Sequence, residues 1–464
     1  MPFSGKKVAV VGLAVNNTPL IRYLVQASAE VTVLDQKKPE LLEKYLRQIS
    51  DLTLQYQLGP EYLSNLDGQD VVFLSPGIPR NLPPIQAAKK KGVRFSSELQ
   101  LFFSLNKSPV IGVTGSSGKT TTTTLIGEML ARFRPTRVGG NIGRPPLSFL
   151  SELKKETWIV LELSSFQLQN LGHSPHIAVV TNVTPNHLDI HSSMEEYIDA
   201  KSEVLKNQSH NDFAVLNWDN DITRSMVEQV KGECFFFSRL CQLERGAYLK
   251  GDELVLAIKD TDQSGDSVEH ICYRNDLTLL GEHNLENVLA AALTARLAGA
   301  PMGIITTVIK EFKGVEHRLE PVRELGGVRY YNDSISTTPT RAVAGLSAID
   351  APIILIAGGY DKRLPFDEFA EVAAERCRAV YLFGATARQI EEAFNQVKRL
   401  RKKQRGFPQI KLVSNLEVAV KLAKNIAVPG DVVLLSPACA SYDMFRNFEE
   451  RGALFKKLVS ELKP

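Results

Sequence analysis

The segment from residue 108 to residue 125, SPVIGVTGSSGKTTTTTL, constrains the fold more than any other part of the sequence. An apolar run typical of a buried strand leads into a loop of small residues, and a stretch that we expect to be helical from about Thr120 to Phe133 follows. In open parallel sheets, ligands collect where such strands end and the next helix begins. We therefore expect an α/β sheet with a binding loop at its carboxyl edge.

The loop has the residue pattern of a phosphate-binding loop, in which backbone N–H groups and a helix N-terminus surround phosphate oxygens. Lys119 would neutralise phosphate charge, and the Thr120 hydroxyl would bind Mg²⁺. Val113 stands where the full pattern has its first glycine. The alternative is a Gly/Ser turn with an ordinary helix cap. The expected phosphate contacts are Gly115, Ser116, Ser117, Gly118, Lys119, Thr120 and Thr121.

Short apolar runs separated by helical stretches recur along all 464 residues, which are too many for one compact core. We predict three α/β domains in series, at residues 1–98, 99–314 and 315–464. The stretch from 229 to 275 is predicted to form short antiparallel strands and loops, and 284–299 a long amphipathic helix. The predicted buried strands lie at 6–12, 31–35, 71–79, 108–115, 158–165, 176–183, 328–333, 353–359, 379–384 and 431–437.

Composition is that of an ordinary globular protein, with 44% hydrophobic residues, 23% charged residues and a net charge of +3. Such a balance gives no reason to expect a nucleic acid or a membrane as partner, and the basic run at 398–405 fits a solvated loop better. No apolar window is long enough for a membrane helix. Five cysteines without metal-type spacing favour a reducing cytoplasm.

The first domain invites comparison with dinucleotide-binding domains, which carry Gly-x-Gly-x-x-Gly after the first strand. Here the three positions are Gly12, Ala14 and Asn17, so two glycines are missing. Asp35 at the end of the second strand keeps the topology plausible. We expect a nucleotide-type domain without the NAD fingerprint, which weakens an NAD-dependent oxidoreductase as an alternative function.

Further polar residues follow the predicted strands of the central domain. Glu162 ends an apolar strand, and a buried carboxylate there needs a cation or hydrogen bonds. His187 follows the next strand, and Lys201 lies on the helix after it. By spacing alone, a structural histidine and a solvated lysine are the more common cases. Asn284 and Asn287 share one helix face, where they could read a nucleobase, although Asn284 could instead cap the helix.

The third domain has four polar clusters at strand ends, which structure alone would hardly require. They contain His317 and Arg318; Asp333, Ser334 and Thr337; the turn at 358–362; and the segment at 436–448.

The motifs SPGIP, TGSSGKTTT, GGNIG, ELSSFQL, NVTPNHLD, GEHNLENVLAA, HRLEPV, NDS and LLSPACASYDMFRNFEERG occur in this order along nearly the whole chain. In kind and order they resemble the Mur ligase family of peptidoglycan synthesis, and ELSSFQL and SPACAS resemble its D-glutamate-adding members. The resemblance implies a Rossmann-like domain, a P-loop ATPase-like domain and a C-terminal Rossmann-like domain, in a protein that is a cytoplasmic monomer. It implies ATP-dependent ligation of D-glutamate to UDP-MurNAc-L-alanine through an acyl phosphate.

The resemblance also assigns roles to residues. It implies two Mg²⁺ ions, held by Thr120 and Glu162 and by His187 and a carbamylated Lys201, with Lys119 on the phosphates. The adenosine part of ATP or its phosphates would contact Asn284, Asn287, Arg318 and Asp333. D-Glutamate would contact Thr337, Lys362, Ser441 and Phe448. The UDP-sugar would contact Val15, Asn16, Asp35, Gln36, Lys37, Ser75, Gly77, Asn141, Ser164 and His187.

Two departures from the family pattern stand out, and other functions remain open. The first loop has the sequence GLAVNNT, whereas the family usually has a glycine-rich loop there, and Ile335 stands where many members carry lysine.

A sister ligase with another acceptor is one alternative, although Lys362, Ser441 and Phe448 suit a diamino acid poorly. A regulatory protein without chemistry is another, although Glu162, His187 and Lys201 are all present. We expect the third domain to close on the central one around ATP and D-glutamate.

Overall fold

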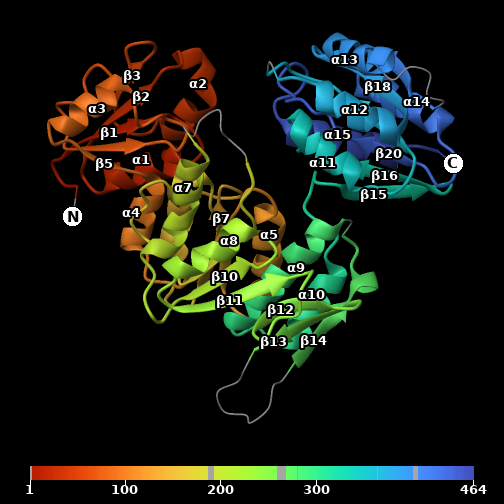
Figure 1. The fold of residues 1–464 in the computed structure, drawn as a ribbon. Coiled ribbons are helices and arrows are strands. Elements are labelled where there is room, and N and C mark those ends of the chain that lie inside the picture. The colour runs from red at the N-terminus through yellow and green to blue at the C-terminus, as the bar shows by residue number, and fades with distance from the viewer. Residues whose placement is uncertain are drawn as a thin grey trace. The chain divides into compact units, whose positions relative to one another are not determined.

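The computed structural model describes residues 3–185, 193–258, 268–279, 281–362, 364–400 and 406–463. The chain divides into two compact units, of which the first comprises Met1–Asp276 and Leu285–Lys310 and the second Leu277–Asn284 and Glu311–Pro464. Figure 1 shows the elements of both units. The predicted α/β fold class is confirmed, with three sheets that are parallel over most of their strands. No helix in the described ranges has both the length and the apolar character needed to span a bilayer.

The N-terminal sheet of the first unit is fully parallel, with strand order β3-β2-β1-β4-β5. Alternate residues of β1 face opposite sides, as a pleated strand requires: Val8 and Val10 join one core cluster, and Ala9 and Val11 join another. The elements are β1 (Lys7–Val11), α1 (Asn17–Gln26), β2 (Glu30–Asp35), α2 (Pro39–Leu46), η1 (Arg47–Ile49), β3 (Gln55–Leu58), β4 (Val71–Leu74), α3 (Pro83–Lys90), β5 (Arg94–Ser96) and α4 (Glu98–Leu105).

The central sheet has the order β14-β13-β12-β11-β10-β9-β6-β8-β7 and is parallel from β7 to β12. Its strands are β6 (Val110–Thr114), β7 (Thr136–Gly140), β8 (Trp158–Glu162), β9 (Ile177–Val180), β10 (Phe213–Asn217), β11 (Glu233–Ser238), β12 (Gly246–Lys250), β13 (Glu253–Ala257) and β14 (Val268–Tyr273). Its helices are α5 (Lys119–Ala131), η2 (Pro146–Glu152), α6 (Ser165–Leu168), α7 (Met194–Lys206), α8 (Asp221–Ser225), η3 (Met226–Gln229), η4 (Arg274–Asp276), α9 (Glu282–Leu297) and α10 (Met302–Glu311).

Two expectations for this region were wrong in part. Among the described residues from 229 to 275, the antiparallel pairs are β12–β13 and β13–β14, whereas β11 pairs in parallel with both β10 and β12. Helix α9 is not amphipathic, because every residue from Asn287 to Ala295 is buried. Its alanine-rich sequence lets neighbouring elements approach it on all sides.

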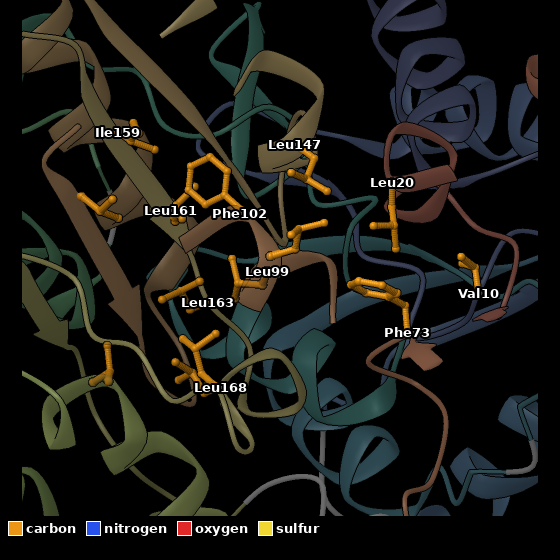
Figure 2. Packing of buried hydrophobic residues seen from close by; sticks show 14 of the residues in the cluster. Val10, Leu20, Phe73, Leu99, Phe102, Leu147, Ile159, Leu161, Leu163 and Leu168 are labelled. Atoms are coloured by element: carbon orange, nitrogen blue, oxygen red, sulfur yellow. The ribbon is translucent and has the colours of Figure 1, made fainter. Parts of the chain in front are cut away.

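One apolar cluster continues from the N-terminal sheet into the central sheet. Phe73 comes from β4 and Leu161 from β8, while Leu99 and Phe102 of α4 belong to the same cluster. Figure 2 shows the two α4 side chains between those of the two sheets. Helix α4 therefore joins the two halves of the first unit by burying apolar surface on both sides.

The second unit contains a six-stranded sheet in the order β15-β16-β20-β17-β18-β19, in which only β15 is antiparallel to its neighbour. Apolar clusters cover both faces. The elements are β15 (Glu320–Leu325), β16 (Val328–Asn332), α11 (Pro339–Ser347), β17 (Ile353–Ala357), α12 (Asp367–Arg376), β18 (Cys377–Leu382), α13 (Ala387–Leu400), β19 (Gln409–Leu412), α14 (Leu416–Ile426), β20 (Val432–Leu435) and α15 (Phe448–Ser460).

Candidate functional site

The candidate phosphate loop joins β6 to α5 at the carboxyl edge of the central sheet. Gly115 has φ of +146° and Gly118 has φ of +81°, which L-residues with side chains rarely adopt. A Cβ at Gly115 would lie 1.9 Å from Thr181 Oγ1, and a Cβ at Gly118 would lie 2.2 Å from Asn287 Oδ1. Both positions therefore require glycine, and backbone alone forms the loop there. The predicted helix after the loop is confirmed within two residues at each end.

The end of the neighbouring strand β9 fixes the shape of this loop. The Ser116 N–H donates to Asn182 O at 2.8 Å, and the Ser117 N–H donates to Asn182 Oδ1 at 3.0 Å. Thr181 Oγ1 donates to Ser117 O at 2.6 Å. Sequence reasoning missed Thr181 and Asn182, although both directly follow a buried strand, which was the available signal.

Two lysines converge on one carbonyl of the loop. Lys119 Nζ donates to Gly115 O at 2.9 Å, and Lys201 Nζ donates to the same oxygen at 2.8 Å. The Lys201 residue is only 1% exposed, and its Nζ lies 4.6 Å from the centre of the Tyr197 ring. Burial, and then the charge of Lys119, lower the pKa of Lys201 well below its ordinary value. The structure thus makes Lys201 a buried amine that loses its proton readily.

Glu162 is the buried carboxylate of the site and is 2% exposed at the end of β8. Thr120 Oγ1 donates to its Oε2 at 2.7 Å, and Asn141 Nδ2 donates to its Oε1 at 2.7 Å. The structure therefore brings together three residues predicted for the site. A hydroxyl and a carboxylate oxygen side by side are the hard oxygen donors that Mg²⁺ prefers.

The other predicted residues of the central domain have mixed outcomes. His187 lies outside the described residues. Asn287 is buried next to Gly118, and Thr122 Oγ1 lies 3.4 Å from its Oδ1. The N-cap interpretation of Asn284 is wrong, because α9 begins at Glu282 and Asn284 lies within the first turn.

Seven of the ten residues predicted for the UDP-sugar lie at the carboxyl edge of the N-terminal sheet, whereas Asn141 and Ser164 belong to the central domain and His187 lies outside the described residues. The oxygens of Asp35 accept the Leu13 N–H at 2.7 Å and the Lys37 N–H at 2.8 Å. Asp35 thus connects the loops after β1 and β2. The expected contacts in these loops are exposed or half-buried, namely Val15, Asn16, Gln36 and Lys37.

Asn17 occupies the position where the dinucleotide fingerprint has its third glycine. Its Nδ2 donates to Gly12 O at 2.6 Å and to Ser75 Oγ at 2.8 Å. This bridge holds the turn after β4, which includes Gly77, against the loop after β1. On the central side, Ser164 caps α6 through a reciprocal capping box with Gln167. The sequence analysis missed the bridging role of Asn17.

Asp333 is buried at the end of β16 in the second unit. Its Oδ2 accepts the hydroxyls of Ser336 at 2.6 Å and Ser436 at 2.8 Å. Burial raises the pKa of Asp333 to about 6, although these hydroxyls and the positive charge of Arg318 oppose the rise. Arg318 also lowers the pKa of His283, which is reduced mainly by burial. The two predicted residues Arg318 and Asp333 therefore lie near each other.

Arg451, which the sequence analysis missed, is fully buried on α15 and connects the loops that follow β16 and β20. Its Nε donates to Ser334 Oγ at 3.0 Å and its Nη2 to Ser334 O at 2.9 Å. The guanidinium also donates to Cys439 O at 3.1 Å and Ala440 O at 3.2 Å. The third loop, after β17, joins them through the Tyr360 N–H, which donates to Ala440 O at 2.9 Å.

The residues predicted for D-glutamate lie on these connected loops. Thr337 follows β16, Lys362 follows β17, Ser441 follows β20, and Phe448 begins the helix that carries Arg451. Ser441 is buried, whereas Lys362 is exposed. Partial removal of the Lys362 ammonium from water and the charge of Arg341 lower its pKa.

Neighbouring side chains complete the second unit's site. The Phe448 ring contacts the His317 ring edge to face, with centres 5.9 Å apart. The Asn332 amide donates to His317 Nδ1 at 2.9 Å. Ile335 is half-buried and bonds through its backbone N–H to His317 O. We see no polar role for the Ile335 side chain.

The sequence matches three domain families: the Mur ligase MurD-like N-terminal domain at residues 6–97, the Mur ligase middle domain at 113–295 and the Mur ligase glutamate ligase domain at 317–439. A phosphate loop, a buried carboxylate beside it and these three domains define the class. The chain belongs to the Mur ligase family.

Relatives over the full length are more specific. The chain is 46% identical over 458 residues to the UDP-N-acetylmuramoylalanine–D-glutamate ligase of Acetivibrio thermocellus, covering 98% of this chain and 97% of the relative. It is also 46% identical over 461 residues to the ligase of that name from Symbiobacterium thermophilum, covering 98% of each.

Solved structures show the same fold at low identity. The UDP-N-acetylmuramate-alanine ligase MurC of Thermotoga maritima has a TM-score of 0.59 at 17% identity, covering 99% of this chain and 100% of the other. The MurF ligase of Thermotoga maritima in complex with ADP has a TM-score of 0.56 at 19% identity, covering 99% and 96%.

Proposed function

We propose that this protein is a cytoplasmic ligase that uses ATP to join D-glutamate to UDP-MurNAc-L-alanine in peptidoglycan precursor synthesis. The observation that carries the proposal is the phosphate loop with the Thr120–Glu162 pair and the buried Lys201 beside it. This arrangement supports chemistry on a nucleoside triphosphate in a chain of this family. The second unit adds a loop cluster with hydroxyl donors and a cation, which suit a carboxylate substrate.

The residues around the loop fit ATP and Mg²⁺. The backbone of the loop has no room for Cβ atoms at Gly115 and Gly118, and the Ser116 and Ser117 N–H groups already donate to Asn182, so the phosphates of ATP would bind at the N-terminus of α5. Thr120 and Glu162 would hold Mg²⁺, while Asn141 keeps the Glu162 carboxylate oriented. Bound Mg²⁺ would neutralise phosphate charge during transfer.

Lys201 fits the expected carbamate. Its neutral amine would attack the carbon of CO₂, forming an N–C bond and releasing a proton. The product is an anion with two oxygens, which removes the repulsion between Lys201 and Lys119 and suits a second Mg²⁺ with His187. Protein incubated with ¹³C-bicarbonate should show a carbamate carbon resonance that is missing in Lys201→Met. The same spectrum from both proteins would contradict the assignment.

The proposed reaction has two steps. A carboxylate oxygen of the alanyl substrate attacks the γ-phosphorus of ATP, and the bond to the ADP oxygen breaks. The amine of D-glutamate then attacks the acyl carbon, loses a proton, and phosphate leaves with the original carboxylate oxygen. Lys119 and the loop N–H groups bind the phosphates, so positioning and charge neutralisation supply most of the acceleration.

Lys362, Ser441 and Thr337 would bind the carboxylates of D-glutamate, and Arg451 holds two of the loops that carry them. Asn284, Asn287, Arg318 and Asp333 would bind the adenosine part of ATP or its phosphates. These assignments rest on the match of each residue to the motifs of the family.

The direct test is phosphate release from ATP with UDP-MurNAc-L-alanine and one of four acceptors: D-glutamate, L-glutamate, lysine or meso-diaminopimelate. We expect release with D-glutamate alone and a product heavier by one glutamate residue. Release with another acceptor would assign the chain to a sister ligase. ATP binding without release in any mixture would favour a regulatory protein.

A matched control separates chemistry from folding. Glu162→Gln keeps the size of the side chain and an acceptor for Thr120, but it removes the negative charge. We expect ATP binding without Mg²⁺ to persist and phosphate release to fall by at least about 100-fold. Unchanged release in Glu162→Gln would contradict the role of this carboxylate.

A further inference from the structure

The hydroxyl of Ser75, which the sequence predicts to contact the UDP-sugar, bonds within the protein. Ser75 Oγ donates to Gly12 O at 3.1 Å and accepts a hydrogen from Asn17 Nδ2 at 2.8 Å. A serine hydroxyl has a single hydrogen to donate. Ser75 therefore cannot donate to an oxygen of the substrate while its bond to Gly12 is in place.

Asn17 closes these contacts into a triangle of hydrogen bonds. Its Nδ2 also donates to Gly12 O at 2.6 Å, so both hydrogens of the amide have acceptors. The amide nitrogen has to face Gly12, because the opposite orientation would bring two oxygens to this distance. Asn17 is only 1% exposed, so its side chain offers no surface to a ligand.

The backbone at this triangle leaves no room for adjustment. Gly12 has φ of +89°, and a Cβ there would lie 2.6 Å from Ser75 Oγ. A glycine at position 17, as in the dinucleotide fingerprint, would leave the loop after β1 without these side-chain bonds. Asn17 instead ties that loop to the turn after β4, just as Asp35 ties it to the loop after β2 through the Leu13 N–H.

We propose that Asn17 and Ser75 act as a pair of positioning residues, which hold the loops after β1 and β4 in the geometry that the UDP-sugar requires. Neither side chain contacts the substrate. The expected contacts Val15 and Asn16 directly precede Asn17 and are exposed and half-buried. This inference rests on the proposed function, because it concerns the affinity for UDP-MurNAc-L-alanine. It changes the role of Ser75 from a substrate contact to a support of the loops.

The test is a double-mutant cycle on the full chain, with the Kd of UDP-MurNAc-L-alanine measured by calorimetry without ATP. Asn17→Leu keeps the branching of the side chain and removes its donors, and Ser75→Ala removes the hydroxyl. We expect each change to raise the Kd about tenfold. The double variant should also be about tenfold weaker, because either change alone opens the same triangle. The Kd of ATP should change less than about twofold in all three variants.

Two controls separate positioning from folding. Asn65→Leu replaces an exposed asparagine of the same domain and should change neither Kd. Urea unfolding shows whether each variant is folded, and Asn17→Ala takes the place of Asn17→Leu if leucine prevents folding. Failure of both Asn17 variants to fold would assign Asn17 to folding alone and overturn the proposal.

A double variant that is about 100-fold weaker would make the two effects independent, and Ser75 would then be a direct contact. Weaker binding in Ser75→Ala with unchanged binding in Asn17→Leu would overturn the proposal too, as would unchanged binding in all variants. Calorimetry needs no turnover, so these results are distinct from a failure of phosphate release with D-glutamate. If the wild-type protein does not bind UDP-MurNAc-L-alanine, both the substrate and the positioning pair are refuted.

Discussion

Replacing Glu98 with glutamine should make the protein more stable at alkaline pH. The Glu98 side chain is buried at the start of α4, and its carboxylate has the Leu147 N–H as donor. Burial raises the pKa of Glu98 from 4.5 to about 7. The folded state therefore holds this proton more tightly than the unfolded chain, so stability is full below pH 4.5 and falls as pH rises towards 7.

A pKa rise of this size corresponds to roughly 3 kcal/mol of unfolding free energy. Glu98→Gln keeps an oxygen that can accept the Leu147 N–H, but it has no charge to bury. We expect the variant to match wild type at about pH 4 and to exceed it by up to roughly 3 kcal/mol at about pH 8.5.

The assay is urea unfolding followed by tryptophan fluorescence, because Trp158 and Trp218, the two tryptophans of the chain, both lie in the unit that contains Glu98. Glu156→Gln, at an exposed position in this unit, is the control and should show no pH-dependent difference. If Glu98→Gln lowers the free energy of unfolding equally at both pH values, desolvation does not disfavour ionisation of the Glu98 carboxyl group, and the reasoning is wrong.

Three further predictions concern the binding loops. Gly118→Ala places a Cβ 2.2 Å from Asn287 Oδ1 at a residue with φ of +81°, so calorimetry should show that ATP binds at least about tenfold more weakly. Unchanged affinity would contradict the loop geometry. Arg451→Met leaves buried carbonyl groups without donors, so it should destabilise the second unit by at least about 2 kcal/mol and raise the KM for D-glutamate more than the KM for ATP. Equal changes in the two KM values would contradict a positioning role for Arg451. Thr120→Val removes the hydroxyl bonded to Glu162, so the Mg²⁺ concentration for half-maximal phosphate release should rise about tenfold or more, with Thr120→Ser restoring it.

Many of the strands, helices and site residues could be predicted, because the sequence patterns that indicate them are short and local. The strand leading into the phosphate loop and the helix after it are encoded within 18 consecutive residues, SPVIGVTGSSGKTTTTTL. Glu162 ends an apolar run, so its position at a sheet edge followed from the parallel topology. The helix α9 was predicted, but its surroundings were not. The alanines of α9 were interpreted as one apolar face of an amphipathic helix. Small side chains, however, also allow a helix to be buried on every side.

The contacts that sequence reasoning missed join residues far apart in the chain. Arg451 donates to Ser334, 117 positions away, and nothing local distinguishes it from a surface arginine. Glu98 bonds the backbone of Leu147 across two domains, a partner with no side-chain signature.

The most direct test of the proposed chemistry follows an oxygen atom. UDP-MurNAc-L-alanine labelled with ¹⁸O in its alanine carboxylate is converted with ATP and D-glutamate, and the released phosphate is analysed by mass spectrometry. An acyl phosphate intermediate predicts one ¹⁸O atom in each phosphate and one in the new amide. Phosphate without ¹⁸O would show that the γ-phosphate never reached the carboxylate, and it would contradict the account.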